Sequence, residues 1–318
     1  MIEHSGMMSN PRVVAVVVTF QPDGKLLCQI LEALEGQVGS VVVVDNGSSE
    51  DVSRHCPPGS AGRVAWKYLG RNTGVAGAQN AGIREAMQKG ATHVLLLDHD
   101  SIPAPGMVSA LVEAYRVLSS PGRKVAAVGP RYKLRGTDQS SFFVRFGALR
   151  FKKIFCDGRG ALEHVRADFL ISSGCLIPVE SLSEIGLMDE SLFVDHVDTE
   201  WFLRARACGY ESYGVARAVM EHCLGDRLAR LPFLGKRGLP VHTPSRFYYI
   251  FRNSFLLYRR GYVSRSWKLN DAIRLFLLSI IFATIIPPRL QYCRMMTRGV
   301  LDGLRGRSGR YPDDGGDS

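Results

Sequence analysis

The chain has 318 residues, of which 46% are hydrophobic and 22% are charged, and this balance is typical of a globular protein that buries a substantial core. Its seven cysteines are odd in number and no two are spaced as Cys-x-x-Cys, which argues against a zinc cluster and against a disulfide framework. The opening residues, MIEHSGMMSNPR, lack a basic segment followed by an apolar one, so no secretion signal is expected. We therefore expect a cytosolic protein with reduced thiols.

The net charge of +10 belongs entirely to the C-terminal third of the chain. Residues 225–318 carry 17 Lys and Arg against 6 Asp and Glu, a net charge of +11, whereas residues 1–224 carry 23 against 24. A basic segment of this kind binds either nucleic acid or an anionic membrane surface. The composition of the residues around these charges distinguishes between the two partners.

Short β-branched runs alternate with helix-like segments through the first half of the chain. Near-continuous apolar runs are typical of parallel strands that are buried on both faces. Strands that alternate with helices predict a doubly wound, mostly parallel α/β sheet, in which ligands bind beyond the carboxyl ends of the strands. The predicted strands are Val13–Val18, Val41–Val44, Val64–Tyr68, Val94–Leu97 and Val125–Val128, and the predicted helices are Asp23–Leu34, Ala76–Lys89 and Pro105–Ser119.

The second half of the chain is less regular. Residues 131–166 contain four glycines and predict β-hairpins or a loop that covers the site. Two helices, Val179–Glu184 and Glu200–Cys208, and one strand, Ser212–Met220, are predicted after it. The Gly-, Arg- and Asp-rich residues from Gly303 onward are expected to form a frayed tail.

Polar side chains follow two of the predicted strands at the point where each strand ends. Asp45, in the segment DNGSS, either accepts hydrogen bonds from a ribose or nucleobase or satisfies the backbone of an Asn-Gly turn. Asp98 and Asp100, in the segment DHDS, are two carboxylates separated by one residue. Hard cations such as Mg²⁺ or Mn²⁺ prefer such oxygen ligands together with phosphates, and a solvated turn is the alternative.

Two further segments place polar groups at the starts of predicted helices. In residues 71–82, RNTGVAGAQNAG, free N–H groups suit an anion, whereas capping by Asn72 or Thr73 is the alternative. This spacing is neither GxGxxG nor a P-loop. In residues 193–201, FVDHVDTEW, one of three acids is either a general base beside a cleft or a helix cap. Trp201 either offers an acceptor an apolar surface or belongs to the core.

Eight short motifs follow one another in a characteristic order along the chain. They are TFQPD (19–23), VVDNGSS (43–49), NTGVAGAQNAGI (72–83), LLLDHDS (95–101), SSGCLIP (172–178), FVDHVDTEWFLRARACGY (193–210), EHCLGD (221–226) and HTPSRFYYIFRNS (242–254). This series resembles glycosyltransferase family 2 and, within it, the bacterial rhamnosyltransferase branch. The resemblance covers residues 12–260, and its most specific segments are DHDS, VDTEW and RFYYIFRN.

The resemblance implies a GT-A-type fold and an inverting, metal-dependent enzyme with an NDP-sugar donor. In the rhamnosyltransferase branch the donor is dTDP-L-rhamnose, the metal is Mg²⁺ or Mn²⁺, and the acceptor is a lipid-linked or polysaccharide chain such as O-antigen. Transfer of another sugar, a nucleotidyltransferase and an inactive membrane-bound scaffold are the alternatives. A nucleotidyltransferase needs a Gly-rich, basic loop after the first strand, and TFQPDGK supplies little of that.

The resemblance also assigns roles to residues of this chain. Asp100 and His222 are metal ligands, and Asp98 faces the ribose or sugar and joins them at the metal. A lone histidine such as His222 is otherwise usually packed and hydrogen-bonded. Asp198 is the base with Asp195 as its local competitor, although the family has Glu-Asp where Val197 precedes Asp198 here. The residues assigned to the nucleotide sugar are Thr19, Phe20, Asp45, Asn72, Gly74, Asn80, Asp98, Ser173 and Gly174.

We expect the chain to divide into an N-terminal extension (1–11), a GT-A catalytic domain (12–225) and a helical, basic, membrane-associating region (226–318). Leu275–Pro288 is uncharged but shorter than the ~20 residues that a membrane span needs, and cations flank it. This pattern predicts an interfacial anchor on an anionic leaflet, and a buried helix packed on the catalytic domain is the alternative. Nucleic acid is disfavoured because the region is apolar and has no groove-reading motif.

A polyprenyl-diphosphate-linked glycan on the cytoplasmic face of the bacterial inner membrane fits such a basic region as acceptor. The enzyme is then expected to be peripheral to that membrane. Arg246 and Arg252, beside two tyrosines, are the candidates to meet the diphosphate, and Trp201 is the candidate to meet the glycan.

Overall fold

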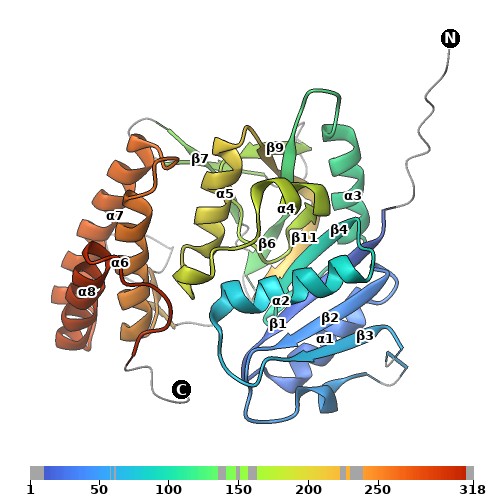
Figure 1. Ribbon diagram of the computed structural model, residues 1–318, viewed down its shortest axis with the longest axis horizontal. Helices are drawn as coiled ribbons and strands as arrows, with labels where there is room; N and C mark the ends of the chain where they lie inside the picture. The colour runs from blue at the N-terminus through green and yellow to red at the C-terminus, as the bar shows by residue number, and fades with distance from the viewer. Residues whose placement is uncertain are drawn as a thin grey trace.

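A nine-stranded mixed sheet lies at the centre of the molecule (Figure 1). The computed structural model describes residues 11–57, 59–60, 62–134, 141–147, 151–156, 163–222, 227–229 and 239–312. From one edge of the sheet to the other the strands are β3 (Val64–Tyr68), β2 (Ser40–Asp45), β1 (Val13–Thr19), β4 (His93–Asp98), β10 (Leu176–Pro178), β6 (Val125–Leu134), β11 (Glu211–His222) and β5 (Ser101–Pro103). The remaining strand, β9 (His164–Ala167), pairs with β11 outside this path.

The strands β3, β2, β1 and β4 run parallel to one another, so their carboxyl ends meet at one edge of the sheet. β6 and β11 are also parallel to each other. The short strand β10 runs antiparallel between β4 and β6, where Leu176 pairs with both Leu95 and Val128. The prediction of a mostly parallel, doubly wound α/β sheet is confirmed, and all the predicted strands are present.

Helices cover both faces of the sheet, because alternate residues of each strand point to opposite faces. One set of β1 valines packs in an apolar cluster with α1 (Gly24–Leu34) and α3 (Met107–Leu118). The other set packs in a second cluster with α2 (Gly74–Gln88), α4 (Val179–Ile185) and α5 (Val197–Ala207). These five helices are the predicted ones, with ends that agree within three residues.

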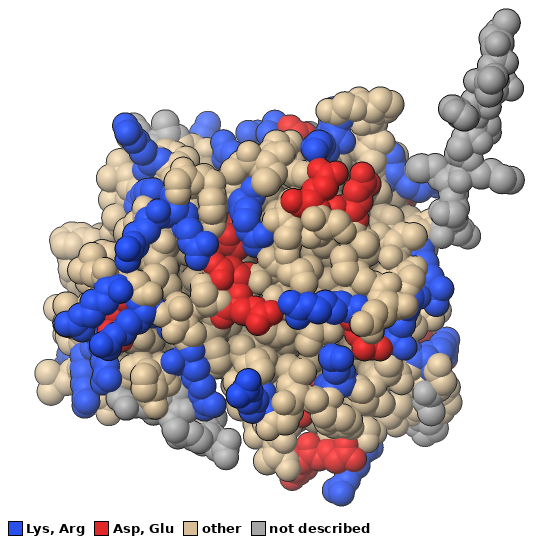
Figure 2. All heavy atoms as spheres, viewed as in Figure 1, with Lys and Arg blue, Asp and Glu red and all other residues tan. Residues whose placement is uncertain are grey.

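Three C-terminal helices, α6 (Pro244–Tyr258), α7 (Arg265–Thr284) and α8 (Arg289–Leu304), lie together beside the sheet (Figure 1). They enclose an apolar cluster of their own. α8 lies close against α6, because a Cβ at Gly299 would be 2.5 Å from the carbonyl oxygen of Tyr248. Basic side chains cover this side of the molecule with few acidic ones between them (Figure 2). The C-terminal region is helical, as predicted.

Residues after α8 fold back onto the protein. The N–H of Gly309 donates to the carbonyl of Ser191 at 2.7 Å, and the N–H of Tyr311 donates to the hydroxyl of Tyr249 at 2.8 Å. The buried ring of Tyr311 packs on that of Tyr248, with centroids 4.3 Å apart. The prediction of a tail frayed from Gly303 is therefore wrong up to Pro312, because an aromatic side chain anchors it. Residues 313–318 lie outside the described residues.

The segment 131–166 contains an antiparallel hairpin of β7 (Phe142–Phe146) and β8 (Phe151–Phe155), as predicted. The rest of that prediction falls partly on residues outside the described ranges. Smaller elements are the antiparallel pair β12 (Arg227–Ala229) and β13 (Leu239–Val241) and the 3₁₀ turns η1 (Val52–His55) and η2 (Glu190–Leu192). Within the described ranges, no helix has both the length and the apolar content that crossing a membrane requires.

Candidate functional site

The carboxyl ends of β4 and β11 bring acids and a histidine into one cluster. β5 runs antiparallel to β11, and this pairing puts Ser101 opposite His222. Nδ1 of His222 lies 2.8 Å from Oγ of Ser101 and 3.4 Å from Oδ1 of Asp100. The hydroxyl of Ser101 also lies within 3.1 Å of Asp100 Oδ1. The structure thus unites Asp100 with His222, which lie far apart in the sequence.

The turn Ser172-Ser173-Gly174 connects this cluster to the second acidic motif. Oγ of Ser173 accepts the backbone N–H of Asp98 at 3.0 Å, and the N–H of Ser172 donates to Oδ2 of Asp198 at 3.0 Å. Gly174 has a φ of 84°, and a Cβ there would lie 2.5 Å from a proline side chain, so the turn needs glycine. Ser173 and Gly174 therefore position the acids, and their contact with a nucleotide sugar stays a prediction.

Negative charge accumulates where these motifs meet. Burial, and then the charges of Asp100 and Asp198, raise the pKa of Asp98 to about 7. Burial also raises the pKa of Asp198, although the backbone N–H of Ser172 partly opposes this. Burial disfavours the charged forms of Asp100 and His222 too, but their mutual contact prevails. The pKa of Asp100 is therefore below, and that of His222 above, its ordinary value.

The donor chemistry of this cluster fits a divalent metal. Asp98, Asp100 and His222 offer the oxygen and nitrogen ligands that Mg²⁺ and Mn²⁺ accept. The raised pKa of Asp98 means that the protein leaves its charge poorly compensated, and a cation would supply that compensation. Among the described residues, no three His, Cys, Asp or Glu side chains are already arranged around one metal position.

The carboxyl ends of β1 and β2 hold the residues predicted to bind the nucleotide. The hydroxyl of Thr19 lies 3.3 Å from Oδ1 of Asp45. Asp45 also accepts the N–H of Ser48 at 3.1 Å and its hydroxyl at 2.5 Å, so it closes its own turn. Gln21, which was absent from the predicted site, binds this turn through Ser48. Its position in the motif TFQPD is the signal in the sequence that could have identified it. Phe20 is partly buried beside them.

Asn46, which was not predicted, ties this turn to the start of α2. Its Nδ2 donates to Oδ1 of Asn72 and to the carbonyl of Gly74, each at 3.2 Å. Its Oδ1 accepts the N–H of Thr73 at 2.8 Å. Gly74 has a φ of 79°, and a Cβ there would lie 2.4 Å from the carbonyl oxygen of Phe193. Asn46 therefore brings Asn72 and Gly74 beside Asp45. Asn46 lies in the motif VVDNGSS, which is the signal in the sequence that could have identified it.

Three of the predicted site residues bind the backbone of residues 185–195. Asn80 donates to the carbonyl of Met188 at 2.9 Å, and its Oδ1 accepts the N–H of the same residue. Trp201 is buried and donates to the carbonyl of Gly186 at 2.9 Å. Arg252 is 0% exposed and donates to the carbonyl of Leu192 at 2.9 Å. A side-chain donor of each of these three residues is therefore bound to a carbonyl of the protein, and their contacts with ligand stay predictions.

The loop that carries the second acidic motif, residues 192–198, has an unusual backbone. Phe193, Asp195 and His196 all have positive φ values, at 65°, 57° and 60°, which side chains other than glycine rarely adopt. The side-chain nitrogen of Asn253 in α6 lies 2.7–2.9 Å from three carbonyl oxygens of this loop. We call residues 192–198 the acidic loop. The strained backbone of this loop is maintained because Asn253 of α6 binds its carbonyl groups.

The two acids of the acidic loop have different partners. Asp195 forms a two-point ion pair with Arg246, with Oδ1 2.7 Å from Nη2 and Oδ2 3.3 Å from Nε. Asp198 instead accepts the backbone N–H of Ser172, beside Asp98. Arg246 keeps 40% of its side chain exposed. The structure therefore brings Asp195, Asp198 and Arg246 to the predicted site.

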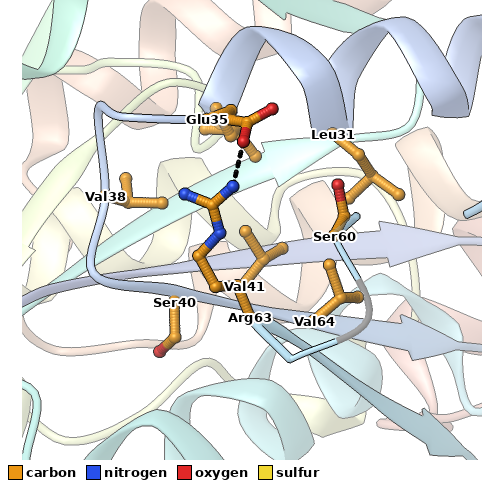
Figure 3. A pocket seen from close by; sticks show the side chains of 9 residues that line it. Leu31, Glu35, Val38, Ser40, Val41, Ser60, Arg63 and Val64 are labelled. Atoms are coloured by element: carbon orange, nitrogen blue, oxygen red, sulfur yellow. Dashed lines mark hydrogen bonds and ion pairs between the residues drawn. The ribbon is translucent and has the colours of Figure 1, made fainter. Parts of the chain in front are cut away.

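A small pocket lies at the opposite end of the sheet, where β2 begins (Figure 3). Leu31, Val41 and Val64 line it, and an ion pair between Arg63 and Glu35 closes one side. Its volume of about 20 Å³ is enough for a water molecule but not for a sugar nucleotide. This pocket is therefore too small to be the donor site.

Three solved structures share the fold of this chain. The crystal structure of GalNAc-T7 with UDP, GalNAc and Mn²⁺ has a TM-score of 0.59 and 15% identity, and the match covers 94% of this chain and 58% of that one. TarS 1–349 of S. aureus has a TM-score of 0.54 and 14% identity, over 93% of this chain and 82% of that one. Its complex with UDP-GlcNAc has a TM-score of 0.55 and 12% identity, over 92% and 81%. These similarities concern the fold, which is of the predicted GT-A type.

A family model described as glycosyl transferase family 2 matches residues 15–186. The chain belongs to glycosyltransferase family 2 and is a glycosyltransferase. It is 32% identical over 308 residues to the dTDP-rhamnosyl transferase RfbF of Shigella flexneri, and the alignment covers 94% of this chain and 98% of that protein. The family that the ordered motifs predict is confirmed.

Proposed function

We propose that this glycosyltransferase moves L-rhamnose from dTDP-L-rhamnose, with inversion and with the help of a divalent metal, to a lipid-linked or polysaccharide acceptor. The observation that carries the proposal is the 32% identity, over almost the whole chain, to a dTDP-rhamnosyl transferase. The product belongs to a cell-surface glycan such as an O-antigen.

The donor fits the carboxyl edge of the parallel strands, where ligands of such sheets bind. Thr19 and Asp45 lie there to receive the nucleobase and ribose, beside Phe20. Asn72 and Gly74 lie next to them, at the N-terminus of α2, where Asn72 accepts the N–H of Gly74. The start of a helix favours a phosphate group.

Asp98, Asp100 and His222 are the residues that would hold Mg²⁺ or Mn²⁺. A metal bound there offsets the negative charge that grows on the departing dTDP. Ser173 holds the backbone of Asp98, and Ser101 bridges Asp100 and His222. These serines therefore keep the ligand set in place before the donor arrives.

In an inverting transfer, the acceptor oxygen bonds to the anomeric carbon as the bond from that carbon to the diphosphate oxygen breaks. The acceptor hydroxyl must give its proton to a base. Asp198 suits this role, because burial raises the pKa of Asp198 and makes it a stronger proton acceptor than an ordinary aspartate. Arg246 holds Asp195 in an ion pair instead.

The proposed acceptor is a polyprenyl-diphosphate-linked glycan, and the proposed location is the cytoplasmic face of the bacterial inner membrane, to which the enzyme binds peripherally. The net charge of +11 in residues 225–318 supports both. Arg246 and Arg252 are the candidates to meet the diphosphate, and Arg246 is the more exposed of the two. Transfer of a different sugar is the alternative.

A thermal-shift comparison of NDP-sugars, each with and without Mn²⁺ or Mg²⁺, tests the donor. A donor at a hundredfold excess over its Kd stabilises the fold by about 2.7 kcal/mol. We expect dTDP-rhamnose with metal to raise the Tm, and chelation to reverse the rise. A shift with UDP-sugars but none with dTDP-rhamnose would show that the sugar assignment is wrong.

A further inference from the structure

The helix α7 is apolar on both of its sides. Trp267, Leu275 and Phe282 point inward and are buried. On the opposite side, five apolar residues at helical spacing are between 45% and 64% exposed. These five residues are Leu269, Ile273, Phe276, Leu277 and Ile280, and we call them the outer face of α7. A contiguous apolar face of this kind marks an interaction site rather than an ordinary surface.

The exposed charges on α7 and α8 are all positive. The two helices contain two acids, Asp271 and Asp302, and both are buried. Asp271 is paired with Arg274 at 2.6 Å. The exposed surface of both helices therefore carries no carboxylate, whereas Arg265, Arg289 and Arg294 are exposed at their ends and sides. Basic side chains dominate this side of the molecule in Figure 2.

We propose that the outer face of α7 docks on a lipid leaflet that contains anionic headgroups. Apolar side chains on one face of a helix enter the boundary between headgroups and acyl chains, and flanking arginines bind the headgroups. A second copy of the chain fits less well, because a two-fold interface would set the same cationic rim against itself. The leaflet satisfies both the apolar face and the cationic rim.

A groove beside the outer face adds to this argument. Its volume is about 210 Å³, and it lies between α6, α7 and α8. Phe251, Phe255, Leu275, Phe276 and Val300 supply most of its apolar wall. Part of a lipid acyl chain from the docked leaflet fits such a groove.

The inner side of α7 touches the acidic loop. Nη2 of Arg274 lies 3.3 Å from Nε2 of His196, and the ring of His196 packs edge-on against Trp267 with centroids 6.0 Å apart. Docking therefore fixes the acidic loop relative to the leaflet. The inference that this position of the acidic loop serves a membrane-borne acceptor rests on the proposed function. The docking of α7 on the leaflet does not rest on it.

Vesicle flotation of the full chain tests the docking. The probes are vesicles of phosphatidylcholine alone and vesicles that also contain phosphatidylglycerol. We expect binding to the anionic vesicles and about tenfold weaker binding after Phe276→Ser combined with Ile280→Ser, since two apolar side chains leave the interface. Arg289→Gln combined with Arg294→Gln should weaken anionic binding to a similar degree, about tenfold.

Matched controls change the same residue types elsewhere. Val117 on α3 is 59% exposed, so Val117→Ser removes a comparable apolar side chain, and Arg116→Gln removes an exposed cation. Neither control should alter flotation. Binding that is unchanged in both double variants overturns the proposal. A dimer that becomes a monomer on Phe276→Ser with Ile280→Ser, by light scattering, also overturns it, because a second copy then covers the face.

The two proposals fail separately. The docking variants should show the same Tm rise with dTDP-rhamnose as the original chain, because they lie away from the donor site. Flotation without any response to dTDP-rhamnose would contradict the proposed function and leave docking intact. A full Tm response to dTDP-rhamnose without flotation would contradict the docking, and with it the proposed membrane location, and leave the proposed donor and sugar transfer intact.

Discussion

Asp195 and Asp198 are separated by two residues on one loop, and their surroundings predict different effects of mutation. Asp198→Asn keeps the shape but removes the proposed proton acceptor, so kcat should fall about 10²- to 10⁴-fold. Asp195→Asn removes a partner of Arg246 and should cost less. Initial-rate kinetics with dTDP-rhamnose measure both. The Tm rise with donor should survive in Asp198→Asn, and its loss would instead make Asp198 a structural residue.

The pH dependence of kcat gives an independent check of the base. Burial raises the pKa of Asp198 above its ordinary value of 3.8, and the charge of Asp195 raises it further. The ionised form is the base, so activity should be lost as the pH falls through this raised pKa. Asp195→Asn removes the neighbouring negative charge and frees the Arg246 guanidinium. Both changes favour the ionised form, so the acid limb of the profile should move to lower pH.

A control for this shift is Glu113→Gln on the exposed surface of α3, which should leave the acid limb in place. An acid limb that stays fixed or moves to higher pH in Asp195→Asn would exclude Asp198 as the titrating group.

Residue chemistry alone could not separate ligands from structural donors. The sequence located Asp98, Asp100 and Asp198, because acids that follow an apolar strand or open a helix are visible as patterns. Arg252 and Asn80 look equally suited to ligands in the sequence, yet both donate to buried carbonyls of residues 188–192. Those carbonyls lose contact with water, and so need a donor from the protein, only in the folded chain. His222 joined the metal set through family resemblance, since its approach to Asp100 depends on a distant strand pairing.

The segment after α8 is an element whose effect can be measured. Tyr311 is buried between Tyr248 and the side chain of Arg298, and its N–H binds Tyr249. Tyr311→Ala should lower the free energy of unfolding by about 3 kcal/mol, because it leaves a cavity in a packed aromatic cluster. Chemical denaturation measures this loss. Tyr68→Ala is the matched control, since Tyr68 is 51% exposed, and an equal loss there would contradict the account.

Elements were predicted from the sequence where the apolar pattern is either continuous, as in strands buried on both faces, or confined to one face of a helix. β1, β2 and β4 are continuous apolar runs, and α1 shows a clear buried stripe, so their positions agree with prediction. β10 has three residues and no pattern of its own. α7 was ambiguous for the opposite reason: both of its faces are apolar, so periodicity could not say which side is buried. The alternative of a buried helix describes the inner side, and the interfacial anchor stays a proposal for the outer side.

In the whole molecule, the boundary at which the charge changes is not a boundary in the packing. The charge changes near residue 225, which is where the sequence suggests that the catalytic domain ends. Packing crosses that boundary. Leu256, Leu257 and Trp267 belong to the same apolar cluster as α2 and α5, and Asn253 holds the acidic loop. α6 and the start of α7 therefore pack with the helices that cover the sheet, and the division at residue 225 stays a prediction.

This packing predicts one cooperative unfolding transition for the intact chain. The three tryptophans report on different parts: Trp66 on β3, Trp201 on α5 and Trp267 on α7. Tryptophan fluorescence and far-ultraviolet circular dichroism should give the same midpoint in urea, as a two-state unit requires. Two separated midpoints would mean that the helical region unfolds alone.

Deletion of residues 265–318 tests whether the catalytic part of the chain depends on the C-terminal helices. It removes α7 and α8, and it therefore exposes Phe247 and Phe251 of α6, which are buried against them. It also removes Gly309, whose carbonyl binds Arg252, and Trp267, which packs on His196. We expect the truncated chain to lose cooperative unfolding and the Tm rise with dTDP-rhamnose. Phe276→Ser with Ile280→Ser, which changes only the outer face, should keep both. A truncated chain that still unfolds cooperatively and binds donor would show that the basic helices are a separable anchor, because nothing in the catalytic part would then depend on them.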